Sequence, residues 1–268
     1  MNGSFQTDAY KPAQIAQLIE SAGVQKARLP TAQMLVLAIL AGAFIGFGAA
    51  AYTMVMTGVD AGFGPARFLG GIVFSLGLIL VIVGGAELFT GNALMVMAAV
   101  DRRIGTAQLF RNWAVVYVGN LIGAAALAVA LGLTGIAEGE FGTTARAIAE
   151  GKAQLSPAQA LTRGLLCNAL VCLAIWLTFA ARTAAGKILA IIWPISAFVL
   201  LGLEHSVANM YFFPQAWIVG SDITVLAAFS NLLWVTAGNI LGGGVAVALA
   251  YRFAYLGPAQ KTDKQKHL

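Results

Sequence analysis

The sequence contains few charged residues and few cysteines. Only 10% of its 268 residues are Asp, Glu, Lys or Arg, whereas a typical soluble domain carries roughly 25%. A chain with so little charge cannot cover a water-facing surface in the usual way. The two cysteines, Cys167 and Cys172, lie in one apolar stretch, which favours two small buried side chains over a disulfide framework.

Several catalytic and binding signatures are also absent. The chain has no Gly-rich phosphate loop with Lys and Ser or Thr, which argues against ATP-driven pumping. It has no Cys/His cluster with metal-ligand spacing and no polar stretch long enough for a soluble catalytic domain. His205 and Ser206 are adjacent, but neighbours in sequence do not by themselves make a catalytic dyad. We therefore expect no enzyme activity, no metal and no cofactor.

Apolar residues dominate the composition. Hydrophobic residues make up 59% of the chain, and the mean hydropathy is +0.83. A helix that spans a bilayer needs about 20 such residues. We predict an all-α integral membrane protein with six transmembrane helices, near residues 34–57, 69–100, 112–133, 159–181, 187–219 and 225–256.

The segments outside these stretches predict one membrane domain with two short flanks. Residues 1–30 place apolar side chains at helical spacing between polar ones, which predicts an amphipathic helix on the cytoplasmic membrane surface. Residues 31–257 form the predicted membrane domain, and residues 258–268 form a cytoplasmic tail. The Gly-rich and charged segment 135–155 is expected to be an outer loop.

Lys and Arg are distributed unevenly between the two sides. If the N-terminus is cytoplasmic, 12 of the 16 basic residues fall on the cytoplasmic side. The other four, Arg67, Arg146, Lys152 and Arg163, fall outside. This asymmetry favours both termini in the cytoplasm, and it accounts for the net charge of +5 without a nucleic-acid partner. We expect a multi-pass protein of the bacterial inner (cytoplasmic) membrane.

The second and fifth apolar stretches are interrupted by the same motif. The pattern G-x-E-x4-N occurs at residues 85–92 and again at residues 202–209, an offset of 117. The segments 112–123 and 231–242 share Asn, Val, Gly, Asn and Gly at an offset of 119. In a membrane, irregular backbone is tolerated only where protein buries it or where it lines a cavity. We therefore predict that both stretches are broken helices.

The repeat predicts two halves of three spans each, near residues 34–133 and 159–256. Because an odd number of spans reverses the chain direction, the halves should be inverted in the membrane. Corresponding broken helices then indicate a binding or permeation site at the midplane. Five glycines permit close helix packing, either between the protomers of a ring or within one protomer: Gly42, Gly46, Gly242, Gly243 and Gly244.

His205 is the sharpest candidate for chemistry. It lies inside the fifth span, and its only neighbouring charge is Glu204. An ionisable side chain at membrane depth is costly and usually faces an internal path. Histidine titrates near neutral pH, so it can donate or withhold a proton. The alternative is a structural histidine that hydrogen-bonds between helices.

Glu87 and Glu204 occupy equivalent positions and need hydrogen-bond donors, because a bare carboxylate in hydrocarbon is unfavourable. Backbone N–H groups and asparagines embedded in apolar sequence could supply them. We expect the polar side chains of the two breaks mainly to hold irregular backbone in place: Glu87, Asn92, Asn209 and Asn239.

Three further residues of the first break are candidates for the permeation path. Leu88 and Phe89 would form a hydrophobic constriction, a device that can gate a pore by dewetting. Core packing is the alternative for these two side chains. Thr90 beside them would offer a hydroxyl group to a passing polar solute.

Taken together, these motifs make the chain resemble the formate/nitrite transporter family over nearly its whole length, from Leu35 to Tyr255. Five stretches carry the resemblance, in order along the chain: residues 74–80 (FSLGLIL), 86–91 (AELFTG), 168–176 (NALVCLAIW), 204–210 (EHSVANM) and 235–239 (VTAGN). The resemblance implies an aquaporin-like protomer, a homopentamer and one anion path per protomer. It also implies that the first break is a mobile loop that closes the cytoplasmic side.

The resemblance assigns roles to individual residues. His205 matches the central histidine of the family, and Lys152, sixteen residues before Asn168, has the spacing of a lysine near the outer mouth. With Asn168 and Glu204, Lys152 would draw anions in and tune the histidine. Asn239 matches a residue within reach of the mobile loop. Besides Leu88 and Phe89, the family constrictions map onto Phe74, Leu78 and Phe198.

These residues predict transport of a small monovalent weak-acid anion. Such an anion can cross an apolar ring as the neutral acid if it first takes a proton, and His205 could supply one. Formate is favoured, with nitrite and hydrosulfide as alternatives, and both a proton-coupled transporter and an anion channel remain open. A neutral-solute channel is a further alternative, although that class has Asn-Pro-Ala loops and neither break here contains Pro.

Overall fold

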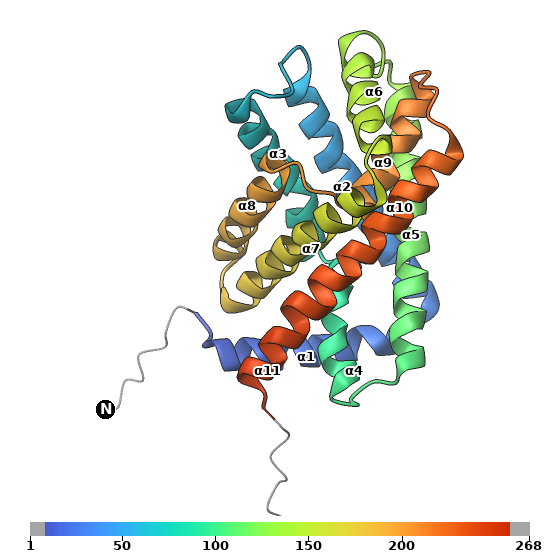
Figure 1. Ribbon diagram of the computed structural model, residues 1–268. Coiled ribbons are helices and arrows are strands. Elements are labelled where there is room, and N and C mark those ends of the chain that lie inside the picture. Colours follow the sequence, from blue (N-terminus) through green and yellow to red (C-terminus); the bar gives the residue numbers. More distant parts are fainter. Residues whose placement is uncertain (1–8, 258–268) are drawn as a thin grey trace, which may run out of the picture.

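The computed structural model describes residues 9–257, which fold almost entirely into helices (Figure 1). The all-α prediction is therefore confirmed. In chain order the elements are α1 (Pro12–Arg28), α2 (Thr31–Met56), α3 (Gly64–Gly84), the 3-10 helix η1 (Gly91–Met95), α4 (Val96–Val100), α5 (Thr106–Leu133), α6 (Glu140–Ala153), α7 (Pro157–Ala180), α8 (Ala184–Leu200), α9 (Ser206–Ile218), α10 (Val225–Ile240), the π-helix η2 (Leu241–Leu249) and α11 (Ala250–Tyr255).

Five of these helices are long and apolar enough to cross a membrane. They are α2, α3, α5, α7 and the continuous helix formed by α10, η2 and α11. Two shorter apolar helices, Gly91–Val100 and Ala184–Leu200, adjoin the two interruptions in the chain. Helices satisfy their own backbone hydrogen bonds, so these sequences can form them without water.

Neither broken segment is a continuous helix. α3 ends at Gly84, and an extended stretch follows before η1 begins at Gly91. α8 ends at Leu200, and α9 begins at Ser206. Gly85 and Gly202 turn the chain at corresponding points, with φ of +86° and +66°. Residues with a Cβ rarely adopt this conformation, so the two glycines let both helices stop.

The two halves of the chain use the same helix contacts. α2 packs against α5 and α3, and α7 packs against α10 and α8 in the same relation. Glycines bring the backbones together, because a Cβ on Gly42 would collide with the carbonyl of Asn120 and one on Gly242 with that of Leu165. These glycines therefore pack helices within one protomer, and they are no argument for a ring of protomers.

The segment between the halves differs from our expectation. Residues 135–155 were expected to be a loop, but they contain α6, whose apolar face buries Phe141, Ala145 and Ala149. Glu140 and Arg146 lie on the exposed face of this amphipathic helix, whereas Lys152 lies on the face toward Glu204. Composition alone does not separate such a helix from a loop. α6 lies at the end of the bundle opposite α1 and α11 (Figure 1). The predicted tail, residues 258–268, lies outside the described residues.

Candidate functional site

The second break is held by buried polar side chains from three helices. The ammonium of Lys152, in the last turn of α6, lies 2.9 Å from Oε1 of Glu204. Nδ2 of Asn209 donates to the other carboxylate oxygen at 2.7 Å and to Oδ1 of Asn231 at 2.8 Å. The carboxylate thus has both a charge partner and a neutral donor, which offsets its removal from water.

Asn239 holds the backbone on both sides of His205. Its Nδ2 donates to the carbonyl of Glu204 at 3.0 Å and to that of Gly164 at 2.8 Å. Its Oδ1 accepts from the backbone N–H of Ser206 at 2.9 Å. One buried amide therefore satisfies two backbone groups that the interrupted helix leaves open and ties them to the carbonyl of Gly164 in α7.

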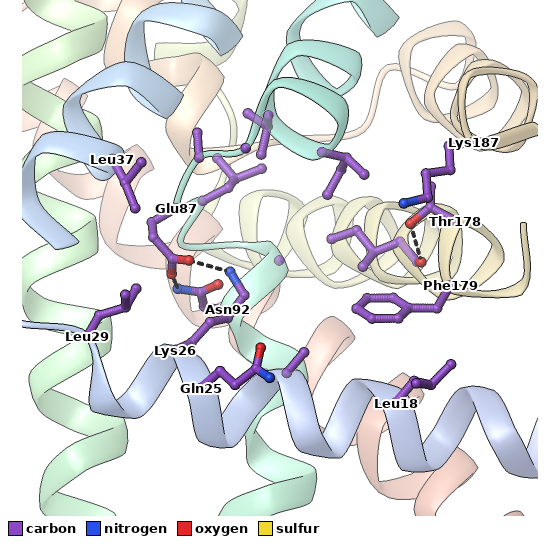
Figure 2. A pocket seen from close by; sticks show the side chains of 18 of the residues that line it. Leu18, Gln25, Lys26, Leu29, Leu37, Glu87, Asn92, Thr178, Phe179 and Lys187 are labelled. Atoms are coloured by element: carbon purple, nitrogen blue, oxygen red, sulfur yellow. Dashed lines mark hydrogen bonds and ion pairs between the residues drawn. The ribbon is translucent and has the colours of Figure 1, made fainter. Parts of the chain in front are cut away.

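The first break is braced by the same bonds. Lys26 Nζ lies 2.6 Å from Glu87 Oε1, and Asn92 Nδ2 donates to Glu87 Oε2 and to Asn112 Oδ1, each at 2.8 Å. Asn120 donates to the carbonyls of Ala38 and Glu87 at 2.7 and 2.9 Å, and it accepts from the N–H of Phe89 at 2.9 Å. Figure 2 shows Lys26, Glu87 and Asn92 gathered at one cavity.

His205 occupies the position that Leu88 occupies in the first break. It precedes the first residue of α9, and its Nδ1 accepts from the N–H of Ala208 at 3.1 Å, as the N-cap of that helix. Because Nδ1 is an acceptor, the ring proton lies on Nε2. Nε2 lies 2.9 Å from Oγ1 of Thr90. His205 thus joins the two breaks and is itself only 3% exposed.

Thr90 is held in turn by α7. Asn168 Nδ2 donates to the carbonyl of Thr90 at 3.1 Å and to the carbonyl of Asn239 at 2.6 Å, which ties the first break to α10. Sγ of Cys172 lies 3.5 Å from the same Thr90 carbonyl, as a further donor. Within residues 9–257, Oδ1 of Asn168 is buried and has no partner. Two side chains of α7 therefore hold the backbone of Thr90, and its hydroxyl group is left to contact His205.

A cavity lies on either side of the Thr90–His205 contact. The α6-side cavity has a volume of about 320 Å³ and is bordered by Lys152, Glu204 and His205. The α1-side cavity has a volume of about 620 Å³ and is bordered by Glu87 and Leu88 (Figure 2). The two cavities share no lining residue.

Two aromatic residues line the α6-side cavity beside His205. Phe74 and Phe198 pack edge to face with ring centroids 5.5 Å apart, and Phe198 stacks on the imidazole of His205 at 6.1 Å. Both phenyl rings border this cavity. Leu78 is buried and borders neither cavity. Phe89 packs edge to face on Trp113 and Tyr117, so it faces α5 instead of a cavity.

The structure brings together residues that the sequence did not single out. Lys26 appeared in the sequence only as one basic residue among several, and Cys172 only as an apolar side chain. The repeat implies that Glu87 needs a cationic partner as Glu204 does, but it does not identify Lys26, which lies in α1 before the repeat begins. No comparable pattern marks Cys172. Within residues 9–257, no group of three His, Cys, Asp or Glu side chains could hold a metal ion.

Comparisons with known proteins agree with one another. The family model described as "Formate/nitrite transporter" matches residues 13–253. The chain is 43% identical to the "Uncharacterized transporter YrhG" of Bacillus subtilis, over 91% of this chain and 93% of that one. It is 38% identical to the "Formate channel FocA" of Escherichia coli (strain K12), over 93% and 95% of the two chains.

Two solved structures have the same fold. A chain described as "FNT family ion channel" superposes with a TM-score of 0.84 at 30% identity, over 90% of this chain and 98% of that one. A "Pentameric formate channel with formate bound" superposes with a TM-score of 0.76 at 38% identity, over 84% and 98% of the two chains.

Proposed function

Because the chain belongs to the formate/nitrite transporter family, we propose that it transports a small monovalent weak-acid anion across a membrane, with formate as its substrate. Relatives named as formate channels match more than nine-tenths of this chain, including FocA of Escherichia coli and BtFdhC of Bacillus thuringiensis. Nitrite and hydrosulfide are the alternatives within this function. A neutral-solute channel is disfavoured, because that class has Asn-Pro-Ala loops and neither break here contains Pro.

The observation that carries the proposal is the buried hydrogen bond between Thr90 and His205, which borders the α6-side cavity, while Leu88 and Gly91 of the first break border the α1-side cavity. An anion that leaves the α6-side cavity meets Phe74 and Phe198 and then this pair. A bare anion crosses apolar surroundings only at a cost of several kcal/mol. The neutral acid avoids most of that cost, and Nε2–H and the Thr90 hydroxyl can both hydrogen-bond its oxygens.

We propose that transport is proton-coupled and that His205 is the proton donor. In the arrangement described above the ring is neutral, because Nδ1 accepts from Ala208. A second proton from solvent must therefore reach the ring before it can give one away. An arriving anion stabilises the resulting imidazolium by its charge. The added proton occupies Nδ1 and displaces the hydrogen bond from the N–H of Ala208. Transfer of the Nε2 proton to the anion then leaves a neutral ring with its proton on Nδ1 and a neutral acid, which loses its proton on the far side. The ring regains its starting form when Nδ1 releases its proton and Nε2 takes one up.

The topology and assembly follow from the same reasoning. We propose six spans in two inverted repeats, with the second and fifth spans broken. The matching hydrogen bonds and ion pairs of the two breaks support this arrangement.

We propose a homopentamer by similarity to the pentameric formate channel. We also place both termini on the cytoplasmic side of a bacterial inner membrane, since α1 and α11 lie at the same end of the bundle (Figure 1) and basic residues concentrate there.

The test is uptake of labelled formate into proteoliposomes at two pH values. Wild-type protein should take up formate faster at the lower pH. His205→Gln keeps a hydrogen-bonding side chain but cannot titrate near neutral pH, so it should lose the acid stimulation and retain a slow leak. His205→Phe should abolish both, because it leaves an unbroken apolar plug.

Each contrary result has a specific meaning. If His205→Gln retains the full pH dependence, His205 is not the proton donor and Lys152 becomes the next candidate. If proteoliposomes that contain the wild-type protein take up formate no faster than protein-free liposomes, formate is not the substrate. The same vesicles loaded with nitrite or hydrosulfide then test the alternatives, and stopped-flow water permeability tests a neutral-solute channel.

A further inference from the structure

The two lysines beside the breaks are already neutralised by the protein. Lys152 pairs with Glu204 at 2.9 Å and lies 5.1 Å from the ring centroid of Phe212, and its side chain is 15% exposed. Lys26 pairs with Glu87 at 2.6 Å. An ion pair is a dipole, and its attraction for a distant anion is much weaker than that of a single charge. Anions must therefore be drawn to the cavities by other groups.

Arg67 is such a group at the α6-side cavity. It lies in the first turn of α3 and borders this cavity together with Lys152 and His205. Its guanidinium makes no ion pair or hydrogen bond with any residue of 9–257, and its Nε is buried without an acceptor. Nη2 lies 2.6 Å from the point where a Cβ on Gly202 would be. The glycine of the second break thus leaves room for the guanidinium.

Lys187 has the corresponding place at the α1-side cavity. It is the fourth residue of α8, as Arg67 is the fourth residue of α3, and α3 and α8 are the first parts of the two broken segments. Lys187 borders the cavity that contains the Lys26–Glu87 pair (Figure 2). No ion pair or hydrogen bond links its ammonium to the part of the chain that the structure describes. Each cavity therefore contains one lysine in an ion pair and one cation with neither an ion pair nor a hydrogen bond among the described residues. Arg163 also borders the α6-side cavity, but its guanidinium donates to the carbonyl of Gly202 at 3.5 Å.

We propose that Arg67 and Lys187 are docking residues for a small carboxylate or similar oxyanion, one at each cavity, before the anion reaches His205. This inference rests on the proposed function. A guanidinium presents a planar pair of N–H donors that matches two oxygens of such an anion, whereas an ammonium acts as a point charge. A fixed charge that borders a cavity raises the local concentration of the oppositely charged solute.

The experiment measures the formate permeability of proteoliposomes well below saturation, in low salt and with added potassium gluconate. In low salt, Arg67→Gln and Lys187→Gln should each lower the permeability about two- to threefold, the effect of one unit charge several ångströms away in water. Gluconate should remove most of this difference by screening. Arg67→Lys should restore most of the low-salt rate. Matched controls are Arg146→Gln and Lys11→Gln, which remove charges that border neither cavity.

The controls separate docking from folding and from general surface charge. Size-exclusion chromatography should show the same assembly for every variant. The inference is overturned if Arg67→Gln and Lys187→Gln match wild type in low salt, or if their losses persist unchanged in gluconate. It is also overturned if Arg146→Gln and Lys11→Gln cause equal losses. Failure of wild-type protein to carry formate would overturn the proposed function as well, whereas normal wild-type transport with unaffected variants would overturn the docking inference alone.

Discussion

The break at Glu87 and the break at Glu204 have the same braces but different residues at the position after the glutamate. Each glutamate binds a lysine and an asparagine, and a second asparagine, Asn120 or Asn239, holds the backbone that follows. The next residue is Leu88 in the first break and His205 in the second. The shared ion pairs and asparagine hydrogen bonds therefore give both breaks the same shape. The difference in chemistry comes from the one side chain after the glutamate.

The two breaks also differ in how far their ion pairs are removed from water. The side chain of Lys26 is 31% exposed, and it comes from α1, which lies across the end of the bundle. The side chain of Lys152 is 15% exposed and comes from α6. Screening weakens an exposed pair, whereas separating a buried pair leaves a charge without compensation. The second break should therefore depend more strongly on its ion pair.

The largest effect is expected from removing the asparagines that hold the backbone. Asn120→Ala and Asn239→Ala each abolish three buried hydrogen bonds, and a buried group left unsatisfied costs about 1–3 kcal/mol. Both variants should lose most folded protein, to a similar extent. Thermal unfolding of detergent-solubilised protein measures the effect. Asn→Asp at the same positions should be no milder. The N–H of Phe89 or Ser206 keeps its acceptor, but a buried carboxylate oxygen then faces the two carbonyls that Nδ2 bonded.

An unequal result would revise the comparison. If Asn239→Ala is tolerated while Asn120→Ala is not, the two breaks do not share one bracing system, and the matching bonds are not equivalent in energy.

An intermediate effect is expected from the ion pairs. Double-mutant cycles with Lys152→Met and Glu204→Gln should give a coupling of about 2–3 kcal/mol, since this pair is largely buried. The cycle with Lys26→Met and Glu87→Gln should give about 1 kcal/mol or less, because solvent reaches that lysine. Both cycles are measured by denaturant unfolding in the same detergent. Equal couplings at the two sites would show that exposure does not set the strength of these pairs.

The smallest effect is expected from a contact that only the first break has. Cys172 donates to the carbonyl of Thr90, whereas the equally buried Cys167 makes no such bond among the described residues. Alanine at either position removes one buried thiol group. The difference in formate uptake between the two variants therefore reports the bond from Cys172 to Thr90. Cys172→Ala should lower formate uptake about twofold more than Cys167→Ala does, corresponding to roughly 0.5 kcal/mol for a weak hydrogen bond. Identical formate uptake in both variants would show that the bond from Cys172 to Thr90 has no effect on transport.

Much of the site could be predicted because it repeats in the sequence. The motif G-x-E-x4-N located both breaks. The matching segments 112–123 and 231–242 contain Asn120 and Asn239, the asparagines that hold the backbone of the two breaks. The resemblance to the formate/nitrite transporter family is confirmed. Lys26 was not predicted, because it lies in α1, before the repeat begins, and only folding brings it to Glu87. α6 was not predicted because a short amphipathic helix with glycines has the composition of a loop.

From the sequence alone, the membrane environment, the positions of the breaks and the unusual place of His205 could be determined. Apolar composition and glycine conformation act locally, so they can be read from neighbouring residues. The tertiary structure decided three other properties. It determined which charges form ion pairs, which glycines pack against the backbone of another helix, and whether Phe89 faces a cavity or α5. These properties arise from contacts between residues that are often 60 or more positions apart, such as Lys26 with Glu87 and Thr90 with His205, and no local pattern encodes them.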